Sequence, residues 1–102
     1  MTVKLAILKS GEDVIADMQE MILDEKVIGF FFDKPCVVKL IRSENENDSY
    51  TMSLYPWIPL SKSDRIPVIN DWVVSIVDPI DKLSEMYIND ILGSSNNKNE
   101  EN

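Results

Sequence analysis

The 102-residue chain contains no histidine, only one cysteine and only three glycines. Without histidine it lacks the commonest general base and the commonest transition-metal ligand, which argues against a zinc site. Cys36 can form no intrachain disulfide, and its apolar surroundings beside Pro35 predict a small, buried hydrophobic residue rather than a nucleophile. The glycines lie too far apart for a phosphate-binding loop or a dinucleotide fingerprint. We therefore expect a protein that is not an enzyme and has no catalytic or cofactor-binding residues.

Acidic residues occur in close pairs, and these are the one remaining candidate for a metal site. The pairs are Asp13/Asp17, Asp24/Glu25 and Asp78/Asp81. Carboxylate oxygens suit hard cations, so a hard-cation site is one interpretation of these pairs. A solvated strand face or a helix N-terminus explains the same pairs without any ligand. We therefore predict no metal site.

Basic residues and long apolar runs are both scarce. The chain has 10 basic and 18 acidic residues, a formal net charge of −8. Such a charge opposes phosphate-rich nucleic acid and anionic membrane surfaces. No apolar run approaches the roughly 20 residues of a membrane-spanning helix, and the first residues carry no signal-peptide pattern. With the lone cysteine, these features predict a cytoplasmic protein that does not enter membranes.

Alternating apolar and polar side chains predict five β-strands. Their approximate ranges are 2–9, 13–22, 27–41, 50–60 and 66–77. The third strand holds three consecutive phenylalanines bracketed by Gly29 and Pro35, which indicates a sharp bend. In the fifth strand, Val74 alternates with Trp72 and Ile76, which predicts that these three side chains share one buried face.

The hydrophobic period changes after the fifth strand and predicts a helix at about 79–92. Asp78 would be its N-cap and Pro79 its first residue, and Ile80, Leu83, Tyr87 and Ile91 would form its apolar stripe. The polar stretch 94–102 is expected to be disordered. Strands with short turns and one late helix predict a single mostly β domain over 1–93. We expect a small, strongly bent five-stranded antiparallel barrel with a C-terminal helix.

Strand order and several local residues resemble the Sm-like family, which comprises the Sm, LSm and Hfq proteins. The chain most resembles the divergent members encoded by phages of marine cyanobacteria. Leu8, Gly11, Ala16 and Met18 follow the shape of the family's first motif. The second motif, an apolar residue, Arg-Gly and further apolar residues, is matched in shape by 69–74, with Asn70 and Asp71 in place of Arg-Gly.

The resemblance implies a homo-oligomeric ring, pentameric to heptameric, in the host cytoplasm if the protein is phage-encoded. In the family, the fourth strand of one subunit pairs with the fifth strand of its neighbour. The corresponding interface residues here are Met52, Leu54, Trp72 and Val74. Because a short domain must hide apolar edge strands, a closed ring is also physically reasonable.

The resemblance further implies binding of single-stranded RNA at two loops, where Glu25, Asn70 and Asp71 occupy the matching positions. The alternative is a scaffold that binds a basic protein and no nucleic acid, because the loop motifs and the charge depart from the family. Placement of the cations Lys26, Lys62 and Arg65 would distinguish the two hypotheses. Convergence of these cations around a pore would favour RNA.

Overall fold

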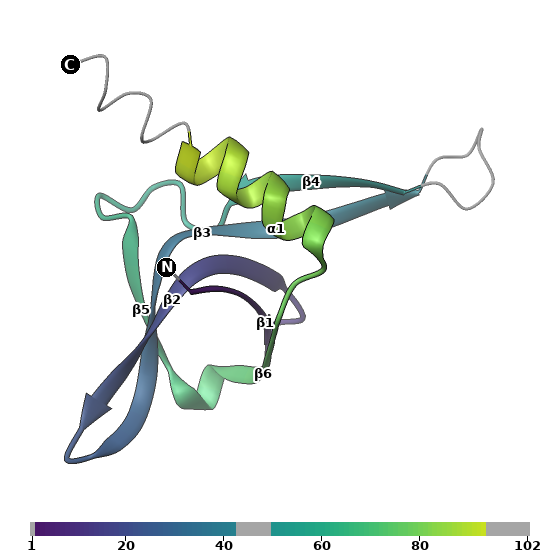
Figure 1. Ribbon diagram of the computed structural model, residues 1–102. Coiled ribbons are helices and arrows are strands. Elements are labelled where there is room, and N and C mark those ends of the chain that lie inside the picture. Colours follow the sequence, from purple (N-terminus) through teal and green to yellow (C-terminus); the bar gives the residue numbers. More distant parts are fainter. Residues whose placement is uncertain (1, 43–49, 94–102) are drawn as a thin grey trace.

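The computed structural model of the protein describes residues 2–42 and 50–93. The stretch 94–102, predicted to be disordered, and the polar loop at 43–49 lie outside the described residues. Six strands and one C-terminal helical segment are described (Figure 1). The strands are β1 (Val3–Leu8), β2 (Asp13–Leu23), β3 (Lys26–Arg42), β4 (Tyr50–Pro56), β5 (Arg65–Ile69) and β6 (Val73–Val77).

The long strand β3 organises an antiparallel sheet with the order β4-β3-β2-β1-β6. One side of β3 pairs with β2. Its other side is shared, since 29–33 pair with β5 and 36–42 pair with β4. Figure 1 shows β3 rising from its hairpin with β2 and then turning to run beside β4. The mostly β antiparallel fold expected from the sequence is therefore confirmed.

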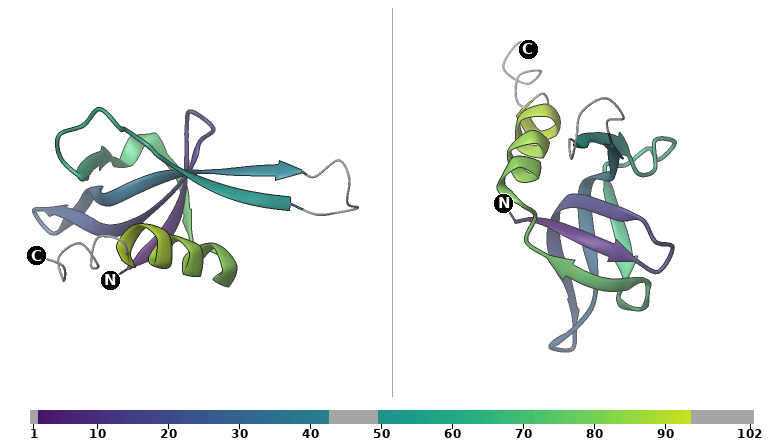
Figure 2. Two further views of the ribbon diagram at one scale, coloured as in Figure 1. Left: turned by 90° about the horizontal axis from the view of Figure 1, so that it is seen from above. Right: turned by 90° about the vertical axis from the view of Figure 1, so that its right-hand side faces the viewer.

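The prediction of five strands is wrong, because the expected fifth strand is two strands. Asn70–Trp72 form a 3-10 turn, η1, and the segments on either side pair with different partners, β5 with β3 and β6 with β1. Asn and Asp have low strand propensity and interrupt the ladder at this point. No ladder joins β5 to β6 among the described strands, so a closed barrel is not shown. Figure 2 shows the resulting curved sheet from two sides.

A bend in the middle of β3, which the sequence predicted, lies at Lys34. Its φ is 50°, in the left-handed region that a lysine rarely adopts. The bend is fastened from the loop that connects β4 to β5. The Lys34 amide donates to the Asp64 carbonyl at 2.8 Å, and the Pro35 carbonyl accepts from the Trp57 amide at 2.9 Å. These two bonds hold the halves of β3 at a fixed angle to each other. The half before the bend pairs with β5, and the half after it pairs with β4.

The concave face of the sheet carries one hydrophobic core, here called the inner core. Its buried members are Ala6, Leu8, Val14, Ala16, Met18, Phe32 and Val68. The three consecutive phenylalanines divide between faces as alternation requires: Phe30 and Phe32 join the inner core, while Phe31 lies beneath the Arg65 side chain on the outer face.

A second core lies between the sheet and the helix and is here called the helix-side core. Ile15, Cys36, Leu83 and Tyr87 are its buried members. Burial of Cys36 confirms the interpretation of this residue as a small core hydrophobe. Figures 1 and 2 show the helix lying over one side of the bent sheet.

The helix starts later than predicted. Helix α1 is Asp81–Tyr87, followed by a π-helical segment, η2, at Ile88–Leu92. Asp78 is not the N-cap, because Ile80 holds that position and Asp78 forms an ion pair with Lys4 of β1. Ile80 is exposed rather than part of the buried stripe, which runs through Leu83, Tyr87 and Ile91.

Candidate functional site

Three strands of the described sheet each have one unpaired edge. Among residues 2–42 and 50–93, β4 and β5 pair only with β3, and β6 pairs only with β1. Unpaired edges expose backbone donors and acceptors that can add another strand. Large apolar side chains are also exposed along β5, η1 and β6, namely Ile69 (66%), Trp72 (42%), Val74 (63%) and Val77 (43%). We call β5, η1 and β6 together the edge segment.

Trp72 and Val74 were expected to share a buried face with Ile76, and this prediction is wrong within one chain. Trp72 lies in η1 rather than in a strand. The ladder between β1 and β6 shifts register between Ile7 and Leu8, so Val73 rather than Val74 lies opposite Leu8. Val73 and Ile76 consequently pack on the inner core, while Val74 faces away from it. Both predicted interface residues are thus free to contact another molecule.

Met52 and Leu54, the other two predicted interface residues, have a different position. They lie on β4, whose outer edge is unpaired, but their side chains are half-buried and pack against the helix-side core. Any contact made by this edge would therefore use the β4 backbone rather than these two side chains. The structure does not bring Met52 and Leu54 together with Trp72 and Val74 in a single patch of the chain.

The two turns expected to bind RNA lie against each other. Asn70 of η1 donates from its side-chain amide to the Val27 carbonyl at 2.6 Å, which fastens η1 to the hairpin formed by β2 and β3. Glu25 lies two residues before Val27, in the exposed turn of that hairpin, and Asp71 is exposed in η1. The three predicted positions therefore belong to one surface, on which Asn70 already has a structural partner.

The hairpin turn itself has a strained backbone. Asp24 and Glu25 have φ values of 51° and 66°, as the central residues of a type I′ turn require, and glycine adopts such values most easily.

Replacing Glu25 by glycine should therefore stabilise the protein by about 0.5–1 kcal/mol, because the strain at φ 66° is relieved. Urea denaturation would measure the change. Glu25→Ala removes the same carboxylate but keeps the strain, so it should give no gain. Equal stabilisation by both variants would show that charge, not backbone conformation, governs this turn.

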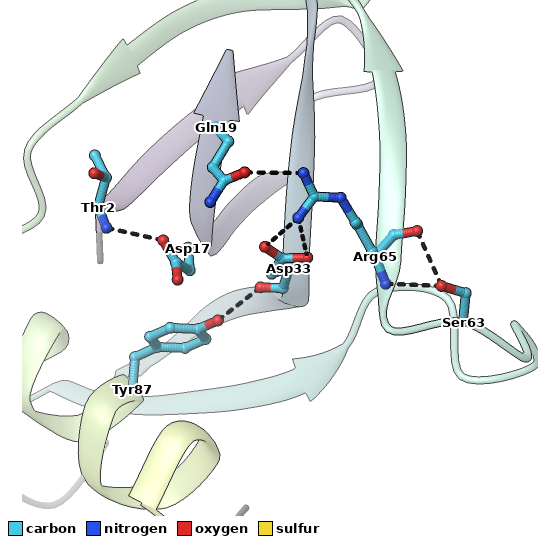
Figure 3. A network of polar contacts seen from close by, with 7 residues as sticks. All are labelled: Thr2, Asp17, Gln19, Asp33, Ser63, Arg65 and Tyr87. Carbon is cyan, nitrogen blue, oxygen red and sulfur yellow. Dashed lines mark hydrogen bonds and ion pairs between the residues drawn. The ribbon is translucent and has the colours of Figure 1, made fainter. Parts of the chain in front are cut away.

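Arg65, one of the cations expected to discriminate between RNA and protein partners, is engaged within the chain (Figure 3). One guanidinium nitrogen lies 3.0 Å from an Asp33 carboxylate oxygen, and the other donates to the Gln19 amide oxygen at 2.9 Å. The guanidinium also covers the Phe31 ring, 4.2 Å from its centroid. Lys26 and Lys62 are exposed; Lys26 is the first residue of β3, next to the hairpin turn, and Lys62 lies in the loop after β4. The charge of Arg65 is thus compensated before any ligand arrives.

Tyr87 fastens the helix to the bend in β3. Its buried hydroxyl donates to the Asp33 carbonyl at 2.9 Å and lies 3.0 Å from the Lys34 carbonyl (Figure 3). Burial raises the pKa of the phenol well above its usual range, and burial also raises the pKa of the Cys36 thiol. Asp33 thus connects β5 and α1 to β3. Its carboxylate pairs with Arg65 of β5, and its carbonyl accepts the hydrogen bond from Tyr87 of α1. No local pattern in the sequence predicts this network, because its members are far apart in the chain.

Alkaline pH should weaken the fold through Tyr87. Because the pKa of Tyr87 is higher in the folded state, its stabilisation is complete below the unfolded pKa of about 10 and is lost as pH rises above that value. Denaturation midpoints compared between about pH 9 and 11 should fall more steeply in the wild-type protein than in Tyr87→Phe. Parallel curves for the two proteins would contradict the assignment.

Several other findings bear on function. Within 2–42 and 50–93, no three side chains of His, Cys, Asp or Glu gather as metal ligands would. No helix in this part of the chain is both long and apolar enough to cross a bilayer. Neither a family model nor a curated protein matches the chain. The Sm-like kinship therefore remains a prediction that rests on the sequence pattern.

Proposed function

We propose that the protein is a non-enzymatic, Sm-like subunit that assembles edge to edge into a closed homo-oligomeric ring, pentameric to heptameric. One observation carries the proposal: within the described sheet, β6 at one end and β4 and β5 at the other each have one unpaired edge. A heterologous contact between unlike edges repeats from copy to copy and ends only by closing. The proposal predicts that β6 of one copy adds to β4 or β5 of the next.

Exposed apolar side chains on the edge segment support this assembly. Ile69 and Val74 are each almost two-thirds exposed, and Trp72 is more than one-third exposed. Covering them would stabilise the assembly by about 25 cal/mol for each Å² of apolar surface removed from water. The added ladder would also satisfy the backbone groups of both edges.

For the ligand of such a ring, the described residues favour a basic protein over single-stranded RNA. The adjoining turns carry Asp24, Glu25 and Asp71, all exposed, while Arg65 is neutralised by Asp33. Phosphate binding depends on uncompensated cations, which this surface supplies only at Lys26. The scaffold hypothesis therefore has the stronger physical support, with RNA as its alternative.

Fluorescence anisotropy at low salt would separate the two ligand classes. Labelled oligo-U, oligo-A and a lysine-rich peptide should be titrated with the protein, and only the peptide is expected to show saturable binding. Asp71→Asn should weaken that binding, since it removes one negative charge from the turn surface. Saturable binding of either oligonucleotide without binding of the peptide would overturn the scaffold assignment.

The assembly itself is tested by Val74→Lys. Because Val74 is exposed and does not contact the inner core, the variant should fold normally but sediment as a monomer, since a buried lysine at a subunit contact is costly. Leu60→Lys is the matched control, because Leu60 is 97% exposed in the loop after β4 and lies off the unpaired edges.

Sedimentation velocity and circular dichroism would report mass and fold together for these two variants. The proposal expects a monomeric, folded Val74→Lys protein and an assembled Leu60→Lys protein. If Val74→Lys assembles as the wild-type protein does, the edge segment is not the contact.

A further inference from the structure

The concave face of the sheet is not completely filled by the inner core. A half-open cavity of about 520 Å³ lies where β1, β2, β3 and β6 meet, near the hairpin formed by β2 and β3. Its size is within the range of small-molecule sites, which recur at the mouths of curved β-structures.

The floor of this cavity is apolar. Met18, Phe30 and Ile76 line it from three different strands, and Ile22 lines it from the end of β2. Met18 is buried and belongs to the inner core, while Phe30 and Ile76 are partly buried against that core. The strands that carry these side chains belong to one ladder, because β2 pairs with β3 and β1 joins β2 to β6.

Two ionisable side chains line the same cavity, and only one of them has a partner of opposite charge. Lys4 forms an ion pair with Asp78 outside the floor. Glu20 lies two residues after Met18 on β2, so both side chains lie on the same face, and Glu20 is directly opposite Phe30 in the ladder. Within the described residues, no side-chain hydrogen bond or ion pair involves the Glu20 carboxylate. The cavity therefore combines an apolar floor with one unpaired negative charge.

We propose that this cavity binds a small organic cation with an apolar body, such as an alkylammonium ion. The ammonium group would pair with the Glu20 carboxylate, and the hydrocarbon would cover Met18 and Phe30. The ring of Phe30, across the ladder from Glu20, offers a further attraction for a cation. The formal charge of −8 attracts cations and repels carboxylates of the same shape. Binding in this cavity is separate from the proposed assembly and does not depend on ring formation.

Methionine methyl groups provide a direct test by NMR, with the full chain labelled at the methionine methyl carbons. Hexylammonium should shift the Met18 signal in a saturable manner. Met52, in the helix-side core, and Met86, on the helix, lie away from the cavity lining and should not respond. 1-Hexanol, which has the same chain without the charge, should bind more weakly, and hexanoate should bind least.

Charge dependence is tested with two matched substitutions. Glu20→Gln should weaken hexylammonium binding about tenfold and leave 1-hexanol binding unchanged, since it removes the ionic partner but not the floor. Glu85→Gln changes the net charge equally on the exposed side of α1, away from the cavity, and should have little effect. The proposal is overturned if Met18 shows no saturable shift with hexylammonium. It is also overturned if hexanoate binds equally well, or if Glu20→Gln has no more effect than Glu85→Gln.

Discussion

Replacing Gly29 by alanine is expected to detach β5 from β3 and to lower the free energy of unfolding by about 2–4 kcal/mol. A methyl group at Gly29 would lie 2.4 Å from the Val68 carbonyl oxygen and 3.3 Å from the Ile69 Cα atom. Both atoms belong to the backbone of the paired strand, so no side-chain rotation can relieve the clash. Urea denaturation followed by the fluorescence of the two tryptophans would measure the loss.

Gly11→Ala is the matched control for this substitution. Gly11 has a φ of 90°, which disfavours alanine, but an added methyl group would meet nothing within 4 Å. Its cost should be that of the backbone alone, about 1–2 kcal/mol. A loss at Gly29 no larger than the loss at Gly11 would show that β5 does not depend on close approach to β3.

Truncating Tyr87 to alanine is expected to release the helix and to cost about 3–5 kcal/mol of stability, a large part of the total for a domain of this size. The side chain is completely buried in the helix-side core, and its hydroxyl supplies a donor to the bend of β3. Near-ultraviolet circular dichroism and urea denaturation would follow the loss of packing.

Conservative substitutions separate the hydrogen bond of Tyr87 from its packing. Tyr87→Phe keeps the ring and should cost only about 1–2 kcal/mol, because it leaves the backbone acceptor at Asp33 without this donor. Tyr55→Phe, at a tyrosine that is 46% exposed, should have almost no effect. If Tyr87→Phe is as damaging as Tyr87→Ala, the hydroxyl rather than the buried ring anchors the helix.

The strands could be predicted where one local pattern determined them. Alternation of apolar and polar residues located β1, β2 and the whole of β3, including its bend between Gly29 and Pro35. Prediction failed where pairing partners decide the outcome. The run from residue 66 to 77 is continuously apolar apart from Asn70, Asp71 and Ser75, and nothing local shows that its halves pair with different strands. The start of α1 was misplaced for a similar reason, because Lys4, 74 residues away, pairs with Asp78.

The candidate surfaces were predictable only in part. The sequence indicated that the late apolar segments were edges, and it placed Glu25 in a turn. It put Asn70 and Asp71 inside the predicted fifth strand, and it predicted the wrong face for Val74. That error arose from a register shift in the ladder with β1, which has no sequence signature. Two further features could not be predicted: the ion pair between Arg65 and Asp33, and the cavity beside Glu20. Each forms only because strands distant in sequence lie side by side.

The mass of the wild-type protein in solution tests the central claim most directly. Light scattering at micromolar concentration should give five to seven times the chain mass of 11.7 kDa, because unlike unpaired edges on one sheet are expected to join until the ring closes. A single species of 11.7 kDa would contradict the account, since it would show that the edges of β4, β5 and β6 remain uncovered in a stable monomer.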